Sequence, residues 1–419
     1  STLSSSSAAS DVYKRQVLEV EEANRQWWVP RFGLNESEEV EIGLKEKYVQ
    51  AFKDFLAPLD EKLAARIVNF SDMTPDESLS QHIAHLVRRI NLLNLRLETG
   101  DLERLRGMPA IPFEPLILQS DQEMIPELDE MVSLSYFHYL IWSLDSGRVK
   151  TEMADLQKLL RHALLQKGGE LNWLVAWANS RESLSDVTLE GFWGGSLPVP
   201  EAKTVRPAFT RAGKEEIEGF LKELEGALPD PGSTLIARQK LDFGKWYRAA
   251  YLENWEIFAS GFSEGANRLA GVEDRRQMIH KMASDQGPYF ALLDRMAEDL
   301  EPLGESESDP GWFNLVFEYQ GVKAEAAALA ASKNTSVLSK ATQKGEQLIG
   351  KLGQKLGKIS REDMIERRLR AGKAYSGYRK LLDEMTAVAG SRKAAFEAAS
   401  QVFGEDPAGE TSPFIGIDK

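Results

Sequence analysis

The chain has 419 residues, of which 42% are hydrophobic and 28% are charged, and its formal net charge is −14. This composition is typical of a folded protein with two or three domains. The acidic balance argues against a general nucleic-acid binder, which needs a basic face. The lack of cysteine excludes disulfides, cysteine metal sites and cysteine nucleophiles.

The first 16 residues differ in composition from the rest of the chain. They are rich in serine and alanine and lack the apolar core of a signal peptide. We interpret 1–16 as a non-native or disordered leader. Because the chain also lacks an initiator methionine, we interpret it as an internal fragment of a longer protein. No later stretch approaches the roughly 20 apolar residues that span a bilayer.

Residues 17–183 are predicted to form an N-terminal helical domain. Apolar residues recur three or four positions apart, as on one face of a helix, in 48–59, 83–97 and 134–142. Two further helices are expected at 151–166 and 171–179. Pro58 is expected to break or kink the first of these helices near its end.

Residues 184–212 are predicted to be a connector between domains. Glycines, prolines and aromatic residues alternate there, which is typical of a loop, with a short strand expected near Val205. We expect a central helical domain at 213–304 and a C-terminal helical segment at 305–419. The fold class predicted is therefore mainly α. Its helices are expected at 214–228, 241–262, 273–284, 288–300, 312–331, 338–356 and 363–389.

An aromatic cluster lies in the predicted helix 241–262. Four of its members are expected to share one helical face, with Tyr247 beside them: Trp246, Tyr251, Trp255 and Phe258. Such rings can stack on nucleic-acid bases. The flanking charges are mixed rather than basic, so we favour a helix–helix core.

Two other patterns resemble known sites. Gly345 to Lys351 nearly spells a phosphate-binding loop, but Leu352 replaces the Ser or Thr that holds Mg²⁺, and no apolar strand precedes it. His82 and His85 have the spacing of metal ligands on a helix, without a third ligand nearby. No nucleophile elbow is present. We predict no catalytic residue, no metal and no cofactor.

The segment 331–380 reverses the charge of the chain. It holds thirteen Lys or Arg residues against four acids, a net charge of +9. A basic amphipathic helix can bind anionic lipid or an acidic partner. The alternative is an exposed helix that pairs with the protein's own acidic surface. The candidate interaction surface comprises Lys351, Lys355, Lys358, Arg367, Arg368 and Arg370.

A series of short motifs in order resembles the IcmF/TssM family of type VI secretion systems. Each motif is weak by itself, and the order makes the set specific. The resemblance covers nearly all of residues 17–419 and rests on 28–34, Tyr48, 136–142, 171–179 (LNWLVAWAN), 187–194 (VTLEGFWG), 205–213 (VRPAFTRAG), Tyr251 with Trp255, 287–293 (GPYFALL), Tyr375 with Tyr378, and 412–414. Gly287 departs from the pattern, because the family more often has serine there.

The resemblance implies a structural role. Members of the family are inner-membrane proteins that build an envelope-spanning complex with an inner-membrane partner and an outer-membrane lipoprotein. This chain resembles the periplasmic part and lacks the transmembrane helices and the cytoplasmic NTPase-like domain. It also stops before the β-rich domain that contacts the lipoprotein in the family. We therefore expect a non-enzymatic scaffold that forms homo-oligomers in the assembly and contacts no nucleic acid.

Two alternatives remain open. One is a helical module that binds a partner or lipid through 331–380. The other is a hydrolase with an unrecognised site. A deep pocket lined by carboxylates or histidines would favour the hydrolase, whereas a flat surface without a pocket would favour the scaffold.

Overall fold

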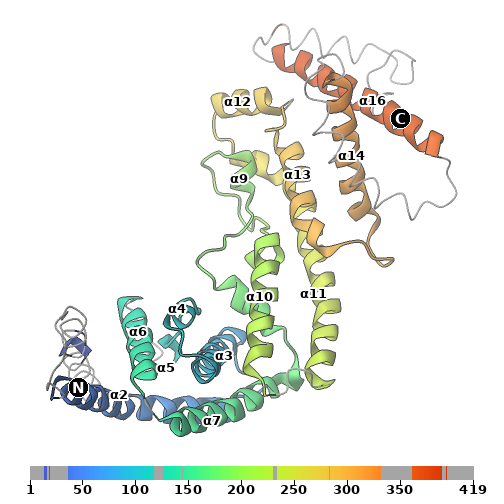
Figure 1. Ribbon diagram of the computed structural model, residues 1–419. Helices are drawn as coiled ribbons and strands as arrows, with labels where there is room; N and C mark the ends of the chain where they lie inside the picture. Colours follow the sequence, from blue (N-terminus) through green and yellow to red (C-terminus); the bar gives the residue numbers. More distant parts are fainter. Residues whose placement is uncertain are drawn as a thin grey trace. The chain divides into compact units, whose positions relative to one another are not determined.

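The computed structural model describes residues 36–117, 126–143, 145–229, 234–282, 284–331 and 361–388, with 14–16, 18 and 393 as isolated additions. The prediction of a mainly α fold is confirmed, because the regular elements in these ranges are helices (Figure 1). The connector 184–212 holds one isolated antiparallel bridge, between Val187 and Val205. Most of the leader and the predicted helix 338–356 lie outside the described residues.

The chain forms two compact units that alternate in sequence. The first comprises Ser1–Leu184 and Gly213–Tyr247, and the second comprises Ser185–Ala212 and Arg248–Lys419. The first unit ends at Leu184 and resumes at Gly213, so most of the predicted connector, with helices α9 (Leu189–Trp193) and η2 (Pro207–Phe209), belongs to the second compact unit. The division splits the expected central domain 213–304 after Tyr247, within one continuous helix.

The first unit consists of helices of varied length. They are α2 (Glu36–Val68), α3 (Asp76–Glu98), α4 (Leu102–Arg106), α5 (Glu114–Ile117), α6 (Pro126–Trp142), α7 (Ser146–Leu164), η1 (Gln166–Gly169), α8 (Trp173–Asn179), most of α10 (Arg211–Ala227) and the first half of α11 (Thr234–Ser260). The expected break at Pro58 is wrong, because α2 continues through it to Val68.

Helix α3 forms the core of the first unit. It packs against α7 and α8, and it also contacts α5 and α6. The predicted apolar stripe is buried along its length, including Ile83, Leu86, Ile90 and Leu93. Burial of a side chain of this size contributes about 1.5–3 kcal/mol, so this stripe is a main source of the unit's stability.

Local sequence signals set where several helices begin. The Asp101 carboxylate accepts hydrogen bonds from the backbone N–H groups of Glu103 and Arg104, at 3.0 and 3.4 Å, and so caps α4. Asp145 caps α7 in the same way through the N–H groups of Gly147 and Arg148. These aspartates supply acceptors for amides that have no partner within their own helix.

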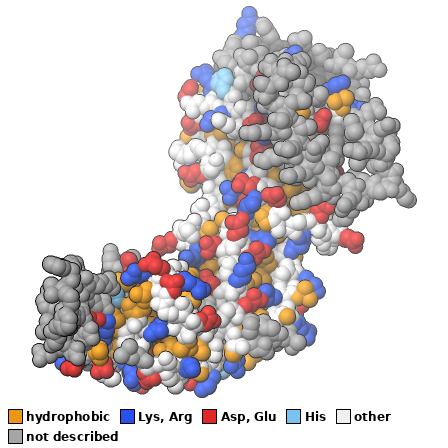
Figure 2. Space-filling view, viewed as in Figure 1, with side chains coloured by type: hydrophobic (Ala, Val, Ile, Leu, Met, Phe, Trp, Pro, Cys, Tyr) orange, Lys and Arg blue, Asp and Glu red, His pale blue; other side chains and the backbone are white. Residues whose placement is uncertain are grey.

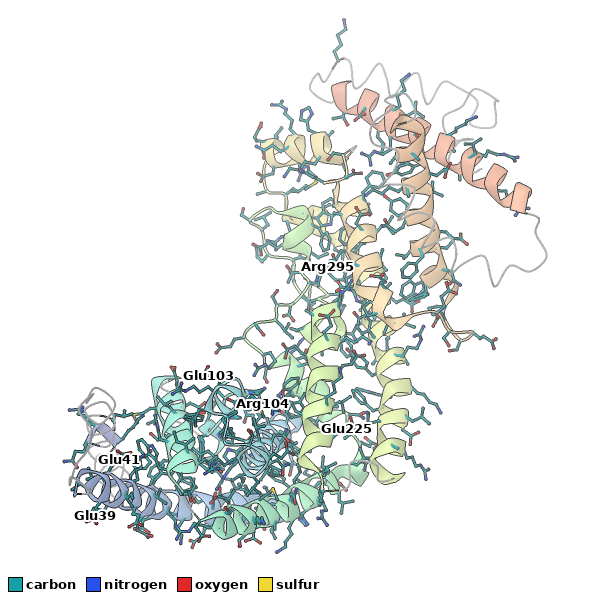
Figure 3. The ribbon with its side chains drawn as sticks, viewed as in Figure 1. Glu39, Glu41, Glu103, Arg104, Glu225 and Arg295 are labelled. Atoms are coloured by element: carbon teal, nitrogen blue, oxygen red, sulfur yellow. The ribbon has the colours of Figure 1, made fainter. Side chains whose placement is uncertain are left out.

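Helix α10 joins the N-terminal helices through aromatic and polar contacts. The Phe220 ring stacks on Trp177, with centroids 4.4 Å apart. The Asn91 amide donates to the Glu223 carbonyl at 2.8 Å. Glu225 of α10, labelled in Figure 3, pairs with Lys240 of α11 at 2.5 Å. The contacts of Phe220 and Glu223 explain why 213–247 belongs with the N-terminal helices, since Asn91 precedes Glu223 by 132 positions.

The second unit is built around the second half of α11. Its other elements are α9 (Leu189–Trp193), η2 (Pro207–Phe209), η3 (Phe262–Arg268), α12 (Val272–Met282), α13 (Pro288–Leu300), η4 (Glu301–Leu303), α14 (Gly311–Ala331) and α16 (Arg361–Val388). The predicted helices 288–300 and 312–331 are confirmed. Among the described helices, none combines the length and apolarity needed to cross a membrane.

Aromatic side chains with a polar edge hold this unit together. The Trp255 indole N–H donates to the Phe209 carbonyl at 2.9 Å, and the Tyr251 hydroxyl donates to the Asp299 carbonyl at 2.6 Å. The Asp299 carboxylate in turn accepts from the backbone N–H of Arg211, the first residue of α10, at 2.6 Å. Each ring thus buries a large apolar area without leaving its polar atom unpaired.

The aromatic cluster of α11 differs from its prediction at one position. Tyr251, Trp255 and Phe258 are fully buried, as expected for a core. Tyr247 is also buried, whereas Trp246 is 41% exposed. The expectation that Trp246 belongs to the core face is therefore wrong. The buried set recurs every three or four residues from Tyr247, which turns Trp246 to the side of that face.

Candidate interaction surface

Half of the predicted interaction surface lies on helix α16. Arg367 and Arg370 are exposed there, and Arg368 lies between them on the same helix. Lys351, Lys355 and Lys358 lie outside the described residues. The described part of the candidate surface is therefore α16 together with the elements that hold it.

Helix α16 packs against α14 and α12. Gly372 faces α14, where an added Cβ would lie 3.3 Å from the Ala326 backbone nitrogen and 3.3 Å from the Glu325 side chain. The absence of a side chain at this position lets the two helices approach closely. Gly372 thus allows a close contact between α14 and α16 at this point.

Aromatic rings from three helices meet beneath α16. Phe290 of α13 stacks on Tyr319 of α14 with centroids 6.4 Å apart, and Tyr375 of α16 meets Phe290 edge to face at 6.1 Å. The Tyr319 and Tyr375 hydroxyls are 3.3 Å apart. Phe290 and Tyr375 come from two motifs that the sequence places more than 80 positions apart. The structure brings these two motifs into contact.

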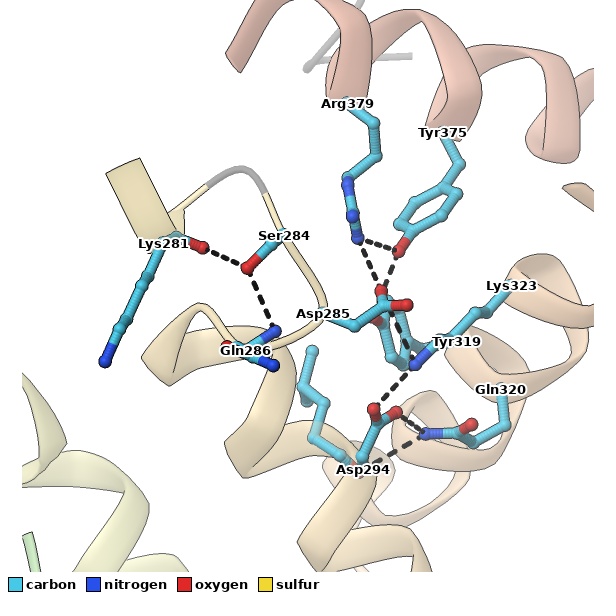
Figure 4. Close-up of polar contacts among 11 residues, drawn as sticks. Lys281, Ser284, Asp285, Gln286, Asp294, Tyr319, Gln320, Lys323, Tyr375 and Arg379 are labelled. Atoms are coloured by element: carbon cyan, nitrogen blue, oxygen red, sulfur yellow. Dashed lines mark hydrogen bonds and ion pairs between the residues drawn. The ribbon is translucent and has the colours of Figure 1, made fainter. Parts of the chain in front are cut away.

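A charged cluster surrounds these rings (Figure 4). The Arg379 guanidinium donates to Asp285 at 2.8 Å and to the Tyr375 hydroxyl at 3.0 Å, and it lies 4.7 Å over the Phe290 ring. The hydrogen bond from Arg379 holds the pKa of the Asp285 carboxyl below its usual range. Arg379 therefore combines a hydrogen bond, an ion pair and a cation–π contact at one point on α16.

A second carboxylate extends the cluster toward α13. The Lys323 ammonium lies 2.6 Å from Asp294 and 3.7 Å from Asp285, and the Gln320 amide donates to Asp294 at 2.9 Å. Lysine and arginine thus alternate with aspartate along the contact. We call the set Asp285, Asp294, Lys323, Tyr375 and Arg379 the α16 latch.

The outward face of α16 is basic. Its exposed cations are Arg367, Arg370, Lys373 and Lys380, and Asp383 is the exposed acid among the described side chains of this helix. Tyr378 and Leu381 are partly exposed on the same helix. Such a face can bind phosphate or carboxylate groups through its cations while its apolar residues contact a surface. Elsewhere, on the face shown in Figure 2, acidic and basic side chains are interspersed over the described residues.

The first unit contains a buried polar centre around Arg89. This side chain is fully buried and forms a bidentate ion pair with the Asp60 carboxylate, with N–O distances of 2.5 and 2.9 Å. Glu152 accepts from Arg89 at 2.7 Å and from the Tyr136 hydroxyl at 2.6 Å. Burial opposes the charge on Arg89, but Glu152, Tyr136 and Asp60 raise its pKa. The guanidinium is thus a permanent cation inside the helical core.

A hollow of about 490 Å³ lies next to this centre, between α2 and α7. Its lining includes four carboxylates, Asp60, Glu61, Glu152 and Asp155, so it meets the criterion set for the hydrolase alternative. Asp60 and Glu152 already act as counter-ions of Arg89. The ion pairs with Arg89 account for the positions of these two carboxylates, and Asp155 pairs with Lys158 at 2.9 Å.

His82 and His85 are buried side chains of α3. The His85 ring nitrogen Nδ1 lies 2.9 Å from the Pro112 carbonyl, and burial lowers the pKa of His85 to about 3. His82 contacts the Ser78 carbonyl at 2.7 Å, and burial lowers its pKa as well. The described residues contain no group of three His, Asp or Glu side chains suited to hold a metal ion. Both rings are neutral near pH 7.

Comparison with family models, with curated protein sequences and with solved structures gives no match for this chain. The resemblance to the IcmF/TssM family therefore stays a prediction from the motifs.

Proposed function

We propose that this chain is a structural scaffold, the periplasmic part of an IcmF/TssM-like inner-membrane protein of a type VI secretion system. The observation that carries the proposal is the ordered set of motifs between residues 28 and 414. In this proposal the chain supports protein secretion by holding other subunits in place and catalyses no reaction.

The positions of the motif residues support a structural role. Trp177 packs on Phe220, and Trp255 donates to the backbone of Phe209. Trp193 donates to the Phe262 carbonyl at 3.0 Å, and an added Cβ at Gly265 would lie 2.1 Å from its ring. The motif aromatics join helices within each unit, which is what a rigid scaffold requires of its most distinctive residues.

The proposed partners follow from the resemblance. They are the inner-membrane partner subunit, the outer-membrane lipoprotein and further copies of this chain.

The exposed basic face of α16 supports a second candidate, a module that binds anionic lipid or an acidic partner. The test is co-sedimentation with vesicles of phosphatidylglycerol and phosphatidylcholine. The variant Arg367→Glu with Lys373→Glu should lose most binding at low salt, because each cation near such a surface contributes about 1 kcal/mol. Arg106→Glu, on exposed α4, is the matched control. Equal binding by all three proteins would remove this candidate.

The scaffold proposal is tested by deletion in a bacterium that carries the gene. Loss of the chain should abolish release of type VI substrates into the medium, and the wild-type gene should restore it. The double variant Glu61→Gln with Asp155→Asn serves as the enzymatic control, because these two carboxylates line the same hollow and do not pair with the buried Arg89. Unchanged secretion in the deletion strain, together with ATP or ester hydrolysis that the double variant lacks, would replace the scaffold with the hydrolase.

A further inference from the structure

Trp246 is the exception among the aromatic residues of α11. Its indole ring is 41% exposed, and it leans on Phe243, whose centroid lies 5.9 Å away. Phe243 is buried and stacks on Tyr247 at 5.4 Å. Trp246 is therefore an exposed ring on a rigid aromatic support, a position that no packing requirement of the core explains.

This ring forms one wall of a hollow of about 540 Å³ within the first unit. The hollow lies between the turn that leads from η1 into α8 and the first half of α11. A volume of this size suits a small ligand of two or three rings. Its lining consists of Gly168, Gly169, Glu170, Leu171, Asn172, Arg238, Gln239, Asp242, Phe243 and Trp246.

The opposite wall is backbone brought close to Gln239. Gly169 has a φ of +79°, and an added Cβ there would lie 2.4 Å from the Gln239 Nε2. Only glycine permits this approach. The Oε1 atom of Gln239 is buried and has no hydrogen-bond partner among the described residues. Gln239 also lines the hollow, and rotation of its amide group can turn this unpaired acceptor toward a ligand that brings an N–H or O–H donor.

The charged side chains around the hollow already have partners in its lining. Arg238 and Asp242 lie 3.7 Å apart, and the Asn172 amide donates to Glu170 at 3.1 Å. A charged ligand would have to displace these pairings. A neutral ligand with many donors and acceptors can add to them, because carboxylates, amides and a guanidinium each keep unused hydrogen-bonding capacity.

We propose that this hollow binds a neutral saccharide, with one sugar ring stacked on Trp246 and its polar groups hydrogen-bonded to Gln239, Asn172 and Arg238. The apolar C–H face of a pyranose packs on an indole ring, and its edge carries donors and acceptors. An N-acetyl sugar suits Gln239 best, because its amide N–H is a donor for the unpaired Oε1. This site is independent of the proposed scaffold role.

A nucleotide is the competing ligand for an exposed tryptophan. Its phosphates need cations or a row of backbone N–H groups. Arg238 is the single cation of the lining, and it already faces Asp242. The surroundings of Trp246 therefore favour the sugar over the nucleotide.

The test is calorimetric titration of the full chain with chitotriose, with cellotriose and AMP as comparison ligands. Chitotriose should bind saturably and more tightly than cellotriose, which lacks the amide. Trp246→Ala should weaken chitotriose binding by at least about tenfold, since stacking on one ring is worth one such factor or more. Leu241→Ala is the matched control, because Leu241 is exposed on the same helix and does not line the hollow.

A second variant separates binding from folding. Gln239→Met keeps the size of the side chain and removes its acceptor, so it should abolish the preference for chitotriose over cellotriose while thermal unfolding stays unchanged. Trp246→Tyr should retain most of the binding. Absence of saturable chitotriose binding, equal binding by Trp246→Ala and Leu241→Ala, or a preference for AMP would each overturn the proposal.

Discussion

The Arg89 centre and the α16 latch use the same chemistry in opposite surroundings. Each places a guanidinium against a tyrosine and carboxylates: Arg89 with Asp60 and Glu152, and Arg379 with Asp285. Arg89 is fully buried, with Asp60 and Glu152 36% and 14% exposed, whereas Arg379 is 22% and Asp285 62% exposed. The extent of burial, and not the identity of the paired residues, therefore decides how much stability is lost when each cluster is broken.

The physical reason is desolvation. A buried ion pair offers little net stability relative to an apolar core, but removing one partner strands a charge away from water. An exposed pair is screened by water and salt, and contributes about 0–1 kcal/mol. The first unit is therefore expected to depend strictly on Arg89, while α16 is held by contacts that can be released at low cost.

The largest expected effect comes from Arg89→Met. It leaves Asp60 and Glu152 without their cation, so the free energy of unfolding of the first unit should fall by about 3–5 kcal/mol. Urea denaturation followed by circular dichroism measures this loss. Arg106→Met, at an exposed pair on α4, is the control and should change little. A loss below 1 kcal/mol for Arg89→Met would show that the centre is not a desolvated cluster.

The next effect is a dependence of stability on acid. The pKa of His85 is about 3 in the folded chain and about 6.5 when exposed, so the unfolded state binds the extra proton. The neutral His85 therefore leaves the free energy of unfolding at its full value above pH 6.5. As pH falls from about 6.5 toward 3, this free energy decreases by up to about 1.4 kcal/mol per pH unit.

The measurement is a series of urea unfolding curves between pH 7 and pH 4, for the wild type and for His85→Gln. The variant should lose much of the slope, whereas His162→Gln, at an exposed ring on α7, should keep it. Parallel pH profiles for wild type and His85→Gln would contradict the burial of a neutral imidazole.

A smaller effect is expected at the α16 latch. Asp285→Asn removes the ion pairs with Arg379 and Lys323, and should cost about 1 kcal/mol or less. Hydrogen exchange should show faster exchange along α16 with no change in the first unit. Because the pair is exposed, 0.5 M salt should reproduce part of the effect in the wild type. Salt-independent protection of α16 would indicate that apolar packing alone holds the helix.

The smallest effect should come from Lys158→Ala, which removes an exposed pair with Asp155 on α7. Both side chains are mostly exposed, so the change in unfolding free energy should stay within about 0.5 kcal/mol. A larger loss, measured by the same urea method, would mean that the exposure of an ion pair does not predict its contribution to the free energy of unfolding.

Helical periodicity predicted most of the fold, because an amphipathic helix leaves a repeating pattern in its own sequence. The stripe through Ile83, Leu86 and Ile90 is an example. Arg89 was missed although a signal was present, since it is a charged residue beside that stripe. Its partners lie 29 and 63 positions away and could not be identified among so many acids.

At the candidate interaction surface, too, contacts between residues distant in the sequence could not be predicted. The charge reversal in 331–380 is visible in the sequence, and the exposed Arg367 and Arg370 of α16 lie within it. The latch beneath them was not predictable, because Asp285, Lys323 and Arg379 come from three separate elements. Trp246 was misassigned because neighbouring positions on a helix differ by 100°, so one step separates a core ring from an exposed one.

The most direct test of the scaffold proposal is affinity capture of the tagged full chain from solubilised envelopes of a bacterium with a type VI system. We predict recovery of the inner-membrane partner subunit or the outer-membrane lipoprotein, equally for the wild type and for Trp246→Ala. Recovery of neither subunit by a chain that is folded and located in the envelope would contradict the proposal.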